Sequence, residues 1–243
     1  MVSARTDIAA NLARLNEQIA SVAIRCGRRP EEITLVGVSK THPAEVVVDA
    51  IRAGLRHVGE NRVQEAAPKL ATVRQLLAAD PVLSAETEMV FHMVGHLQTN
   101  KAGTAVGVFD RVDSVDSPKL AEALSRRLNG AKDLSVLIEV YVGDDPRRPG
   151  VRPHEVMDTV GRILEVPGIR VDGLMTIAPL GGDARAAFSH VRNLKLALSE
   201  TFPRVHFGVL SMGMSEDYHV AIEEGSTELR IGTALFGPRE PRY

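Results

Sequence analysis

The chain has 243 residues, of which 44% are hydrophobic and 25% charged, as in an ordinary globular protein with one large core. The formal charge is -2, and no long run of one sign is present, which argues against nucleic acid or an anionic membrane as the main partner. Cys26 is the only cysteine, the amino terminus lacks the apolar core of a signal peptide, and no apolar run approaches the roughly 20 residues that cross a bilayer. We therefore expect one cytoplasmic domain over residues 1–243.

The first predicted elements place a lysine at the end of a buried strand. Apolar residues at helical spacing predict a helix over residues 6–26, ended by Gly27. The dense apolar run 33–40 is typical of a parallel strand buried on both faces, and it ends in Lys40. A helical pattern opens after Pro43, so Lys40 lies in the turn between strand and helix. A second strand at 55–59 places Asn61 in the same kind of position.

The alternation of strand and helix continues to the end of the chain. Further strands are predicted at 89–95, 108–113, 134–142, 169–177, 205–210 and 228–231. Helices are predicted at 62–77, 119–128, 153–165, 184–200 and 215–224, and a further helical stretch begins at residue 96. Eight strands favour an α/β fold, a single (β/α)8 TIM barrel with an extra N-terminal helix, over a doubly wound open sheet, which has fewer strands. Chemistry in such a barrel lies at the carboxyl ends of the strands, on or near which we expect Lys40, Asn61, His92, Asp113, Thr176, Ser211 and Arg230.

Two segments near the end of the chain predict a phosphate site. Residues 210–215 and 230–233 follow the last two strands and combine small residues with hydroxyls. They lead into helical turns whose backbone N–H groups attract anions, and the loops after strands seven and eight are the usual phosphate site of a barrel. A lysine on the first strand, which closes the barrel beside the eighth, suggests pyridoxal phosphate bound through a Schiff base.

Several motifs in this order resemble one known family. They are Val38-Ser-Lys40, Gly59-Glu-Asn61, Phe91-His-Met-Val-Gly95 with residues 97–101, Gly173-Leu-Met175, the segment 210–215 and Arg230-Ile-Gly-Thr233. The chain resembles the pyridoxal phosphate homeostasis protein family, which is related to the barrel domain of alanine racemase, from the first helix to Phe236. Two departures are Phe91, where the family often has tryptophan, and Arg147 and Arg148, in a loop where a lysine is usual.

The resemblance implies a fold type III pyridoxal phosphate protein. Lys40 would carry the cofactor as a Schiff base, while Ser211, Gly232 and Thr233 would hold the phosphate, with Ser215 a weaker candidate. Arg230 would approach either the pyridine nitrogen or the phosphate. Asn61 would form a wall or donate a hydrogen bond. A cation beside the pyridine nitrogen disfavours its protonation and weakens the ring as an electron sink.

The resemblance also favours a cofactor carrier over an enzyme. Alanine racemases carry a second, β-rich domain that supplies a catalytic tyrosine, and the chain has no room for it after Thr233. We therefore expect no catalytic residue and a monomer that passes pyridoxal phosphate to apoenzymes. Two alternatives stay open: a minor amino acid racemase or isomerase with the same Schiff base, and a phosphate-sugar enzyme that uses the lysine as aldolases do.

Other conspicuous residues have simpler interpretations. His92 and His96 have a spacing that suggests a metal site, but they straddle a strand end and no carboxylate ligand is evident nearby, so no metal is expected. Met212 and Met214 are interpreted as packing residues. The charged loop 144–150 is interpreted as a solvated surface or a partner site.

Overall fold

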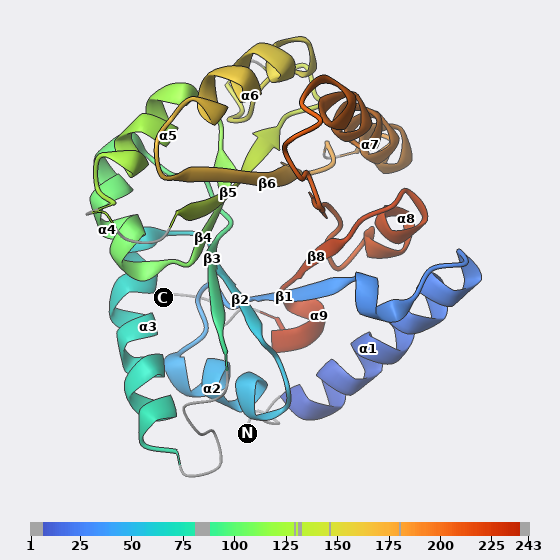
Figure 1. The fold of residues 1–243 in the computed structure, drawn as a ribbon. Coiled ribbons are helices and arrows are strands. Elements are labelled where there is room, and N and C mark those ends of the chain that lie inside the picture. The colour runs from blue at the N-terminus through green and yellow to red at the C-terminus, as the bar shows by residue number, and fades with distance from the viewer. Residues whose placement is uncertain are drawn as a thin grey trace.

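A computed structural model describes residues 7–80, 88–128, 130, 133–145, 147–179 and 181–238. Its eight strands pair in parallel, each with the next and β8 with β1, and close into a barrel (Figure 1). The predicted (β/α)8 fold is therefore confirmed. The strands are β1 Thr34–Val38, β2 His57–Glu60, β3 Val90–Met93, β4 Arg111–Val115, β5 Leu134–Val140, β6 Ile169–Thr176, β7 Val209–Ser211 and β8 Glu228–Ile231.

Helices surround the barrel as a ring (Figure 1). Each buries an apolar stripe against the outer face of the strands, which is why strands and helices alternate in the sequence. None of the described helices is long and apolar enough to cross a membrane. The helices are α1 Ile8–Arg25, α2 Ala44–Arg52, α3 Val63–Ala78, α4 Ala102–Val108, α5 Pro118–Ser125, α6 Val156–Leu164, α7 Ala184–Thr201, α8 Tyr218–Glu223 and α9 Thr233–Phe236, with 3-10 turns η1 Pro30–Glu32, η2 Thr99–Lys101 and η3 Pro153–Glu155.

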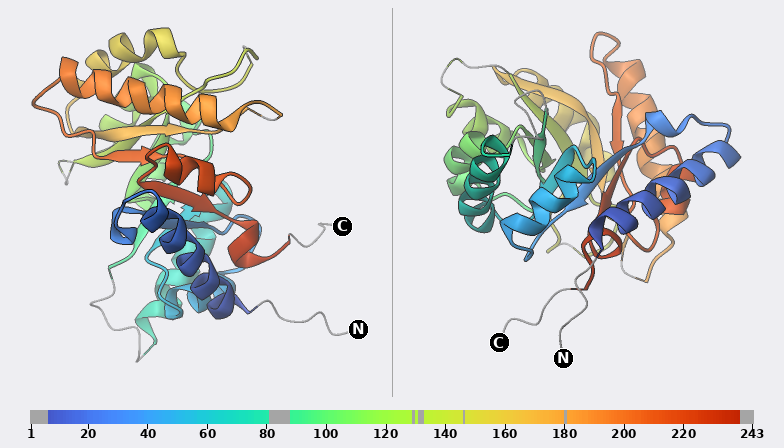
Figure 2. Two further views of the ribbon diagram at one scale, coloured as in Figure 1. Left: turned by 90° about the vertical axis from the view of Figure 1, so that its right-hand side faces the viewer. Right: turned by 90° about the horizontal axis from the view of Figure 1, so that it is seen from below.

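The extra helix α1 lies along the outside of the barrel, beside the junction of β8 and β1 (Figure 2). It packs against α2, α8 and α9, so it covers the place where the first and last units of the barrel meet. Asp7 caps its start, because its carboxylate accepts a hydrogen bond from the N–H of Ala10 over 2.9 Å. Gly27 follows its end with φ at +69°, a left-handed conformation that favours glycine. Gly27 therefore ends the helix as predicted, although the C-cap residue itself is Cys26.

Two strands begin at least three residues later than predicted. The strand predicted at 108–113 begins only at Arg111, because Val108 is the last residue of α4. The strand predicted at 205–210 is the shorter β7, and Val205 instead closes a turn onto the carbonyl of Phe202. At Val108 the error arises because a helix ends in an apolar residue shortly before a strand, and a short apolar run has no periodicity that separates the two. At the second boundary, the apolar residues Val205 and Phe207 belong to the loop between α7 and β7.

The interior of the barrel is unusually rich in charge. Arg111 and Asp113 alternate on β4, as Glu228 and Arg230 do on β8, and residues two apart in a strand share a face. Arg111 forms an ion pair with Glu228 from the other side of the barrel, which shows that this shared face points inward. Branched apolar side chains dominate the interior of most barrels of this type, so these charges indicate a function or a specific polar network.

Candidate functional site

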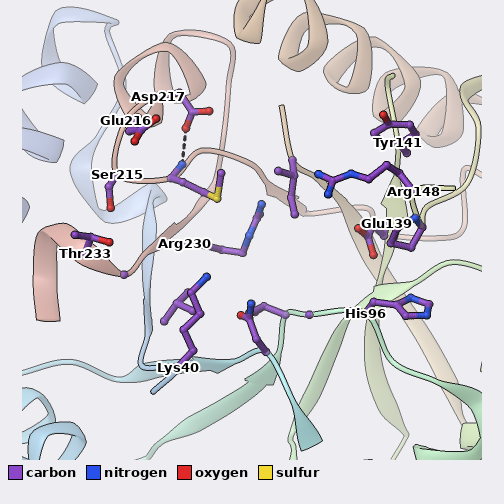
Figure 3. Close-up of a pocket in the computed structure, with 18 of the residues that line it drawn as sticks. Lys40, His96, Glu139, Tyr141, Arg148, Ser215, Glu216, Asp217, Arg230 and Thr233 are labelled. Atoms are coloured by element: carbon purple, nitrogen blue, oxygen red, sulfur yellow. Dashed lines mark hydrogen bonds between the residues drawn. The ribbon is translucent and has the colours of Figure 1, made fainter. Parts of the chain in front are cut away.

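A cavity with a volume of about 470 Å³ lies at the carboxyl ends of the strands. We call it the main pocket. Figure 3 shows Lys40 and Arg230 pointing toward its centre, Ser215 and Thr233 on one side, and Glu139, Tyr141 and Arg148 on the other. Five of the six predicted cofactor residues contribute to the lining, together with the weaker candidate Ser215: they are Lys40, Asn61, Arg230, Gly232 and Thr233.

Lys40 lies two residues beyond the end of β1, in a tight turn. The N–H of His42 donates to the carbonyl of Ser39 over 3.0 Å, which closes this turn around Lys40. Thr41 has φ at +70°, a left-handed conformation that is costly for a β-branched residue. Strained backbone of this kind persists where the surroundings hold it in place, and it clusters at functional sites.

A buried network holds the turn from beneath. The ammonium of Lys69, on α3, donates to the carbonyls of Ser39 and His42 over 2.9 and 3.1 Å. It lies 2.6 Å from the Glu60 carboxylate, which also accepts a hydrogen bond from the Ser39 hydroxyl over 2.5 Å. Lys69 therefore fixes the backbone on both sides of Lys40. The sequence analysis missed Lys69, since only the fold brings α3 under this turn.

Asn61 reaches the main pocket because the next strand leaves room for it. Gly95 follows β3, and a Cβ atom at Gly95 would lie 2.3 Å from the backbone oxygen of Asn61. That distance is far inside van der Waals contact, so any larger residue at this position would displace Asn61. Both residues contribute to the pocket lining, as predicted for Asn61.

One end of the main pocket has the features of a phosphate cup. Ser215, Gly232 and Thr233 line it, and the Ser215 hydroxyl accepts from the N–H of Ala234 over 3.4 Å, which joins the two loops. Gly213 has φ at +100°, and a Cβ there would approach Ala221 to 2.6 Å, so the first loop requires glycine to turn this tightly. Ser215, interpreted from sequence as the weaker candidate, lies at the pocket surface.

Ser211 does not lie at that surface. Its exposed fraction is 0%, and it is absent from the pocket lining. Its hydroxyl accepts a hydrogen bond from the Arg230 guanidinium over 2.8 Å. The side chain points into the barrel, where the next layer covers it, and bonds Arg230. The direct contact of Ser211 with a phosphate stays a prediction.

Arg230 is held rigidly at the floor of the main pocket. Besides Ser211, its guanidinium donates to the carbonyl of Thr176 over 2.7 Å, and the residue is 4% exposed. Burial lowers the pKa of Arg230, while Glu228, Asp113 and Glu139 act against that shift. These contacts orient one edge of the guanidinium away from solvent and leave Arg230 in the pocket lining.

The end opposite the phosphate cup carries a buried acid. Glu139, on β5, is 7% exposed, and among the described residues its Oε2 atom has no hydrogen-bond partner. Burial and then the nearby Asp116 raise the pKa of Glu139 to about 7, and Arg230 and Arg148 lessen the rise. Glu139 therefore changes charge close to neutral pH. Sequence reasoning missed it, because a single acid within an apolar strand has no distinctive pattern.

One interpretation of the sequence gains a detail at this end and another needs correction. Arg148 is exposed, in line with the solvated loop, and it also contributes to the pocket wall, whereas Arg147 forms an ion pair with Asp145. Met214 is 38% exposed and also lines the pocket, so it is not a packing residue like the fully buried Met212.

The two histidines occupy different environments. His92 is buried inside the barrel, with its Nδ1 atom 3.1 Å from the Asp113 carboxylate, and exposed His96 lies 3.4 Å from Asp116. Each thus has a carboxylate neighbour, contrary to the expectation from sequence. His92, Asp113 and Glu228 lie close enough to hold a metal ion. Arg111, however, already bonds both carboxylates and supplies the positive charge there.

The same interior network continues to β2. The Nδ1 atom of His57 lies 2.9 Å from Nε2 of His92. Burial and then the charges of His92 and Arg111 lower the pKa of His57 to about 4. Burial would raise the pKa of Asp113, but Arg111 and His92 hold it below its usual range. The charges under the main pocket are therefore fixed at neutral pH and brace its floor.

Comparisons with known proteins place this site within a family. A family model described as the alanine racemase N-terminal domain matches residues 10–240. The pyridoxal phosphate homeostasis protein of Escherichia coli is 37% identical over 236 residues, which are 96% of this chain and 97% of that protein. The protein of the same name from Aquifex aeolicus is 38% identical over 235 residues, or 94% of this chain and 97% of the relative.

Solved structures show the same likeness. PipY of Synechococcus elongatus is 36% identical, and the match covers 95% of this chain and 100% of PipY, with TM-scores of 0.82 for the structure without pyridoxal phosphate and 0.80 for the structure with it bound. Alanine racemase of Bacillus anthracis, at 16% identity and a TM-score of 0.63, shares the fold over 56% of its own length. Both the family model and these near full-length identities show that the chain belongs to the pyridoxal phosphate homeostasis proteins, within the alanine racemase N-terminal domain family.

Proposed function

We propose that the protein binds pyridoxal 5'-phosphate in the main pocket, holds it as a Schiff base on Lys40 and delivers it to apoenzymes as a non-catalytic carrier. The observation that carries this proposal is the shape of one cavity: a lysine side chain and an arginine meet at its centre, with a hydroxyl-lined cup at one end. The name of the relatives and the bound cofactor in PipY support it. The carrier acts in the cytoplasm and as a monomer.

The residues of this chain fit the cofactor in three places. Ser215, Gly232 and Thr233 would hold the phosphate at the cup, where a glycine lets a ligand approach the backbone closely. Lys40 would condense with the aldehyde and release one water. Asn61 would border the ring. The bound cofactor would supply a reactive aldehyde that its carrier shields from other amines.

Arg230 supports a carrier rather than an enzyme. Ser211 and Thr176 fix the position of its guanidinium. A guanidinium is a very weak acid, so Arg230 does not donate a proton to the pyridine ring. With Arg230 at the ring nitrogen rather than at the phosphate, its permanent positive charge would disfavour protonation of the ring and with it the stabilisation of negative charge on a substrate.

An amino acid isomerase is the second candidate. The observation that favours it is the presence of Glu139 and Tyr141 in the same pocket as Lys40, because both are able to exchange protons. Incubating the loaded protein with single enantiomers of amino acids in deuterated water separates the two functions. A carrier leaves the α-proton and configuration unchanged. Saturable deuteration that Lys40→Ala abolishes contradicts the carrier.

The transfer experiment tests the carrier directly. Loaded protein is mixed with the apo form of a pyridoxal phosphate enzyme in the presence of an excess of an amine that traps free cofactor. We expect the apoenzyme to gain activity faster than with the same concentration of free cofactor under these conditions. Equal rates from the carrier and from free cofactor would overturn delivery while leaving binding intact.

A further inference from the structure

The main pocket extends beyond the part that the proposed cofactor residues surround. Lys40, Ser215 and Thr233 lie on one side of Arg230, and Glu139, Tyr141 and Arg148 lie on the other (Figure 3). We call the second group, with Ile177 and Pro149 from the same lining, the acid end. The proposed function assigns no ligand to the acid end.

The buried carboxyl group of Glu139 indicates that the acid end binds a ligand. Its side chain is more than nine-tenths buried, and within the described part of the chain its Oε2 atom has no hydrogen-bond partner. An unsatisfied buried carboxyl oxygen costs free energy, and such atoms in native structures call for an explanation. A ligand with a hydrogen-bond donor, above all a cationic ammonium, would satisfy this oxygen.

Arg148 supplies the opposite charge at the same end. Its backbone is anchored, since its N–H donates to the carbonyl of Asp145 over 3.2 Å and its carbonyl accepts from Arg152 over 3.4 Å. Within the described residues no carboxylate forms a hydrogen bond or ion pair with its guanidinium, in contrast to that of Arg147, which bonds Asp145 twice. A guanidinium at a pocket wall is well suited to a carboxylate, which it binds through two parallel hydrogen bonds.

We propose that the acid end binds a small zwitterion of the α-amino acid class, with its ammonium against Glu139 and its carboxylate on Arg148. The side chain of the ligand lies toward Ile177 and Pro149. The amino group then lies in the same cavity as Lys40. This proposal rests on the proposed function only for the ligand at the other end of the pocket. An experiment can therefore contradict either proposal without contradicting the other.

The charges around Glu139 decide how binding varies with pH. Asp116 opposes its ionisation, whereas Arg230 and Arg148 favour it, and His96 and Tyr141 line the same cavity. Because Glu139 has a pKa of about 7, it is largely neutral in acid and charged above neutrality. An ammonium prefers the charged carboxylate. Affinity for the zwitterion should therefore rise as the pH increases from about 6 to about 8.

Isothermal titration with L-alanine tests the proposal, with propionate and ethylamine as probes that each carry only one of the two charges. The protein is used both without cofactor and after loading and borohydride reduction, which prevents exchange of amines at the cofactor. We expect saturable L-alanine binding in both forms. Either probe should bind at least about tenfold more weakly, which corresponds to a loss of ~1.4 kcal/mol of binding free energy.

Variants provide the matched control. Arg148→Gln should weaken L-alanine binding about tenfold or more, and Arg147→Gln, in the neighbouring position but outside the pocket lining, should leave it unchanged. Glu139→Gln should remove the rise in affinity with pH. Undetectable L-alanine binding, or equal losses in Arg147→Gln and Arg148→Gln, overturns the proposal. A failure to load cofactor with L-alanine binding intact overturns the proposed function alone.

Discussion

Lys69 donates a hydrogen bond over 2.9 Å to the carbonyl of Ser39, the residue directly before Lys40. The same ammonium holds the carbonyl of His42 on the far side of the turn and pairs with Glu60 beneath it. One buried cation thus ties α3 to the backbone that carries the proposed tether. The Lys69 ammonium takes the place of water as a hydrogen-bond donor to these carbonyls, which lie beyond the end of β1.

Lys69→Met should therefore loosen the turn and destabilise the fold. The change leaves the fully buried Glu60 carboxylate without its cation, a situation that costs about 3 kcal/mol. Cofactor affinity should also fall, because Lys40 loses its fixed backbone. Urea denaturation and a titration with pyridoxal phosphate measure the two effects. The double change Lys69→Met and Glu60→Gln should recover stability but not affinity; recovery of both would show that Lys69 has no positioning role.

Ser215→Ala and Ser211→Ala separate a cofactor contact from a positioning residue. Ser215 lies at the pocket surface, so its hydroxyl is available to the phosphate, and its removal should weaken pyridoxal phosphate binding by about 1.5 kcal/mol. Binding of pyridoxal, which lacks the phosphate, should hardly change. Ser211→Ala removes a partner of Arg230 and should affect both ligands alike. The same selectivity in Ser211→Ala would contradict these assignments.

Glu139→Gln should stabilise the protein in alkaline but not in acidic solution. The pKa of Glu139 is raised from 4.5 to about 7, so between these values the folded state binds a proton that the unfolded state has lost. Stability of the wild type attributable to this group is thus present below about pH 4.5 and lost as the pH rises through 7. Denaturation at about pH 5 and pH 8 should show a gain of about 1–3 kcal/mol for the variant only at the higher pH.

Asp113→Asn should destabilise the barrel interior at neutral pH. The carboxylate is fully buried and bonds both Arg111 and His92, and its loss leaves part of the Arg111 charge uncompensated. Removal of one member of a buried ion pair costs about 3 kcal/mol or more. Because the pKa of Asp113 is held low, the difference between wild type and variant should shrink only in strong acid. A difference that already disappears at about pH 5 would contradict this ordering.

The fold was predictable from sequence because each barrel unit repeats the same local pattern. Eight apolar runs separated by amphipathic helices leave few alternatives, and the positions of Lys40 and Asn61 after β1 and β2 follow from that count. Gly232, Thr233 and Arg230 were likewise predicted from the small and charged residues at the end of the last strand, and all three line the main pocket. Their contact with a cofactor stays a prediction. The prediction lost accuracy at Val108, where a helix ends shortly before a strand, and at Val205, where apolar residues belong to a loop.

The rest of the site depends on packing that local pattern does not encode. Ser211 ends β7 and Ser215 lies in the loop that follows, and only the depth of each residue in the barrel determines which one is covered. Lys69 is in reach of Ser39 because α2 and α3 pack together. Glu139 is perturbed by groups from other strands and loops. Such contacts join residues that are far apart in the chain, so no single stretch of sequence reveals them.

Borohydride reduction of the loaded protein, followed by digestion and mass measurement of the peptides, tests the role of Lys40 most directly. The proposal requires the reduced cofactor on the peptide that contains Lys40, in one copy per chain, and its loss from that peptide in Lys40→Ala. Label found instead on Lys69 or Lys101, or unchanged labelling of Lys40→Ala, would contradict the assignment of Lys40 as the tether.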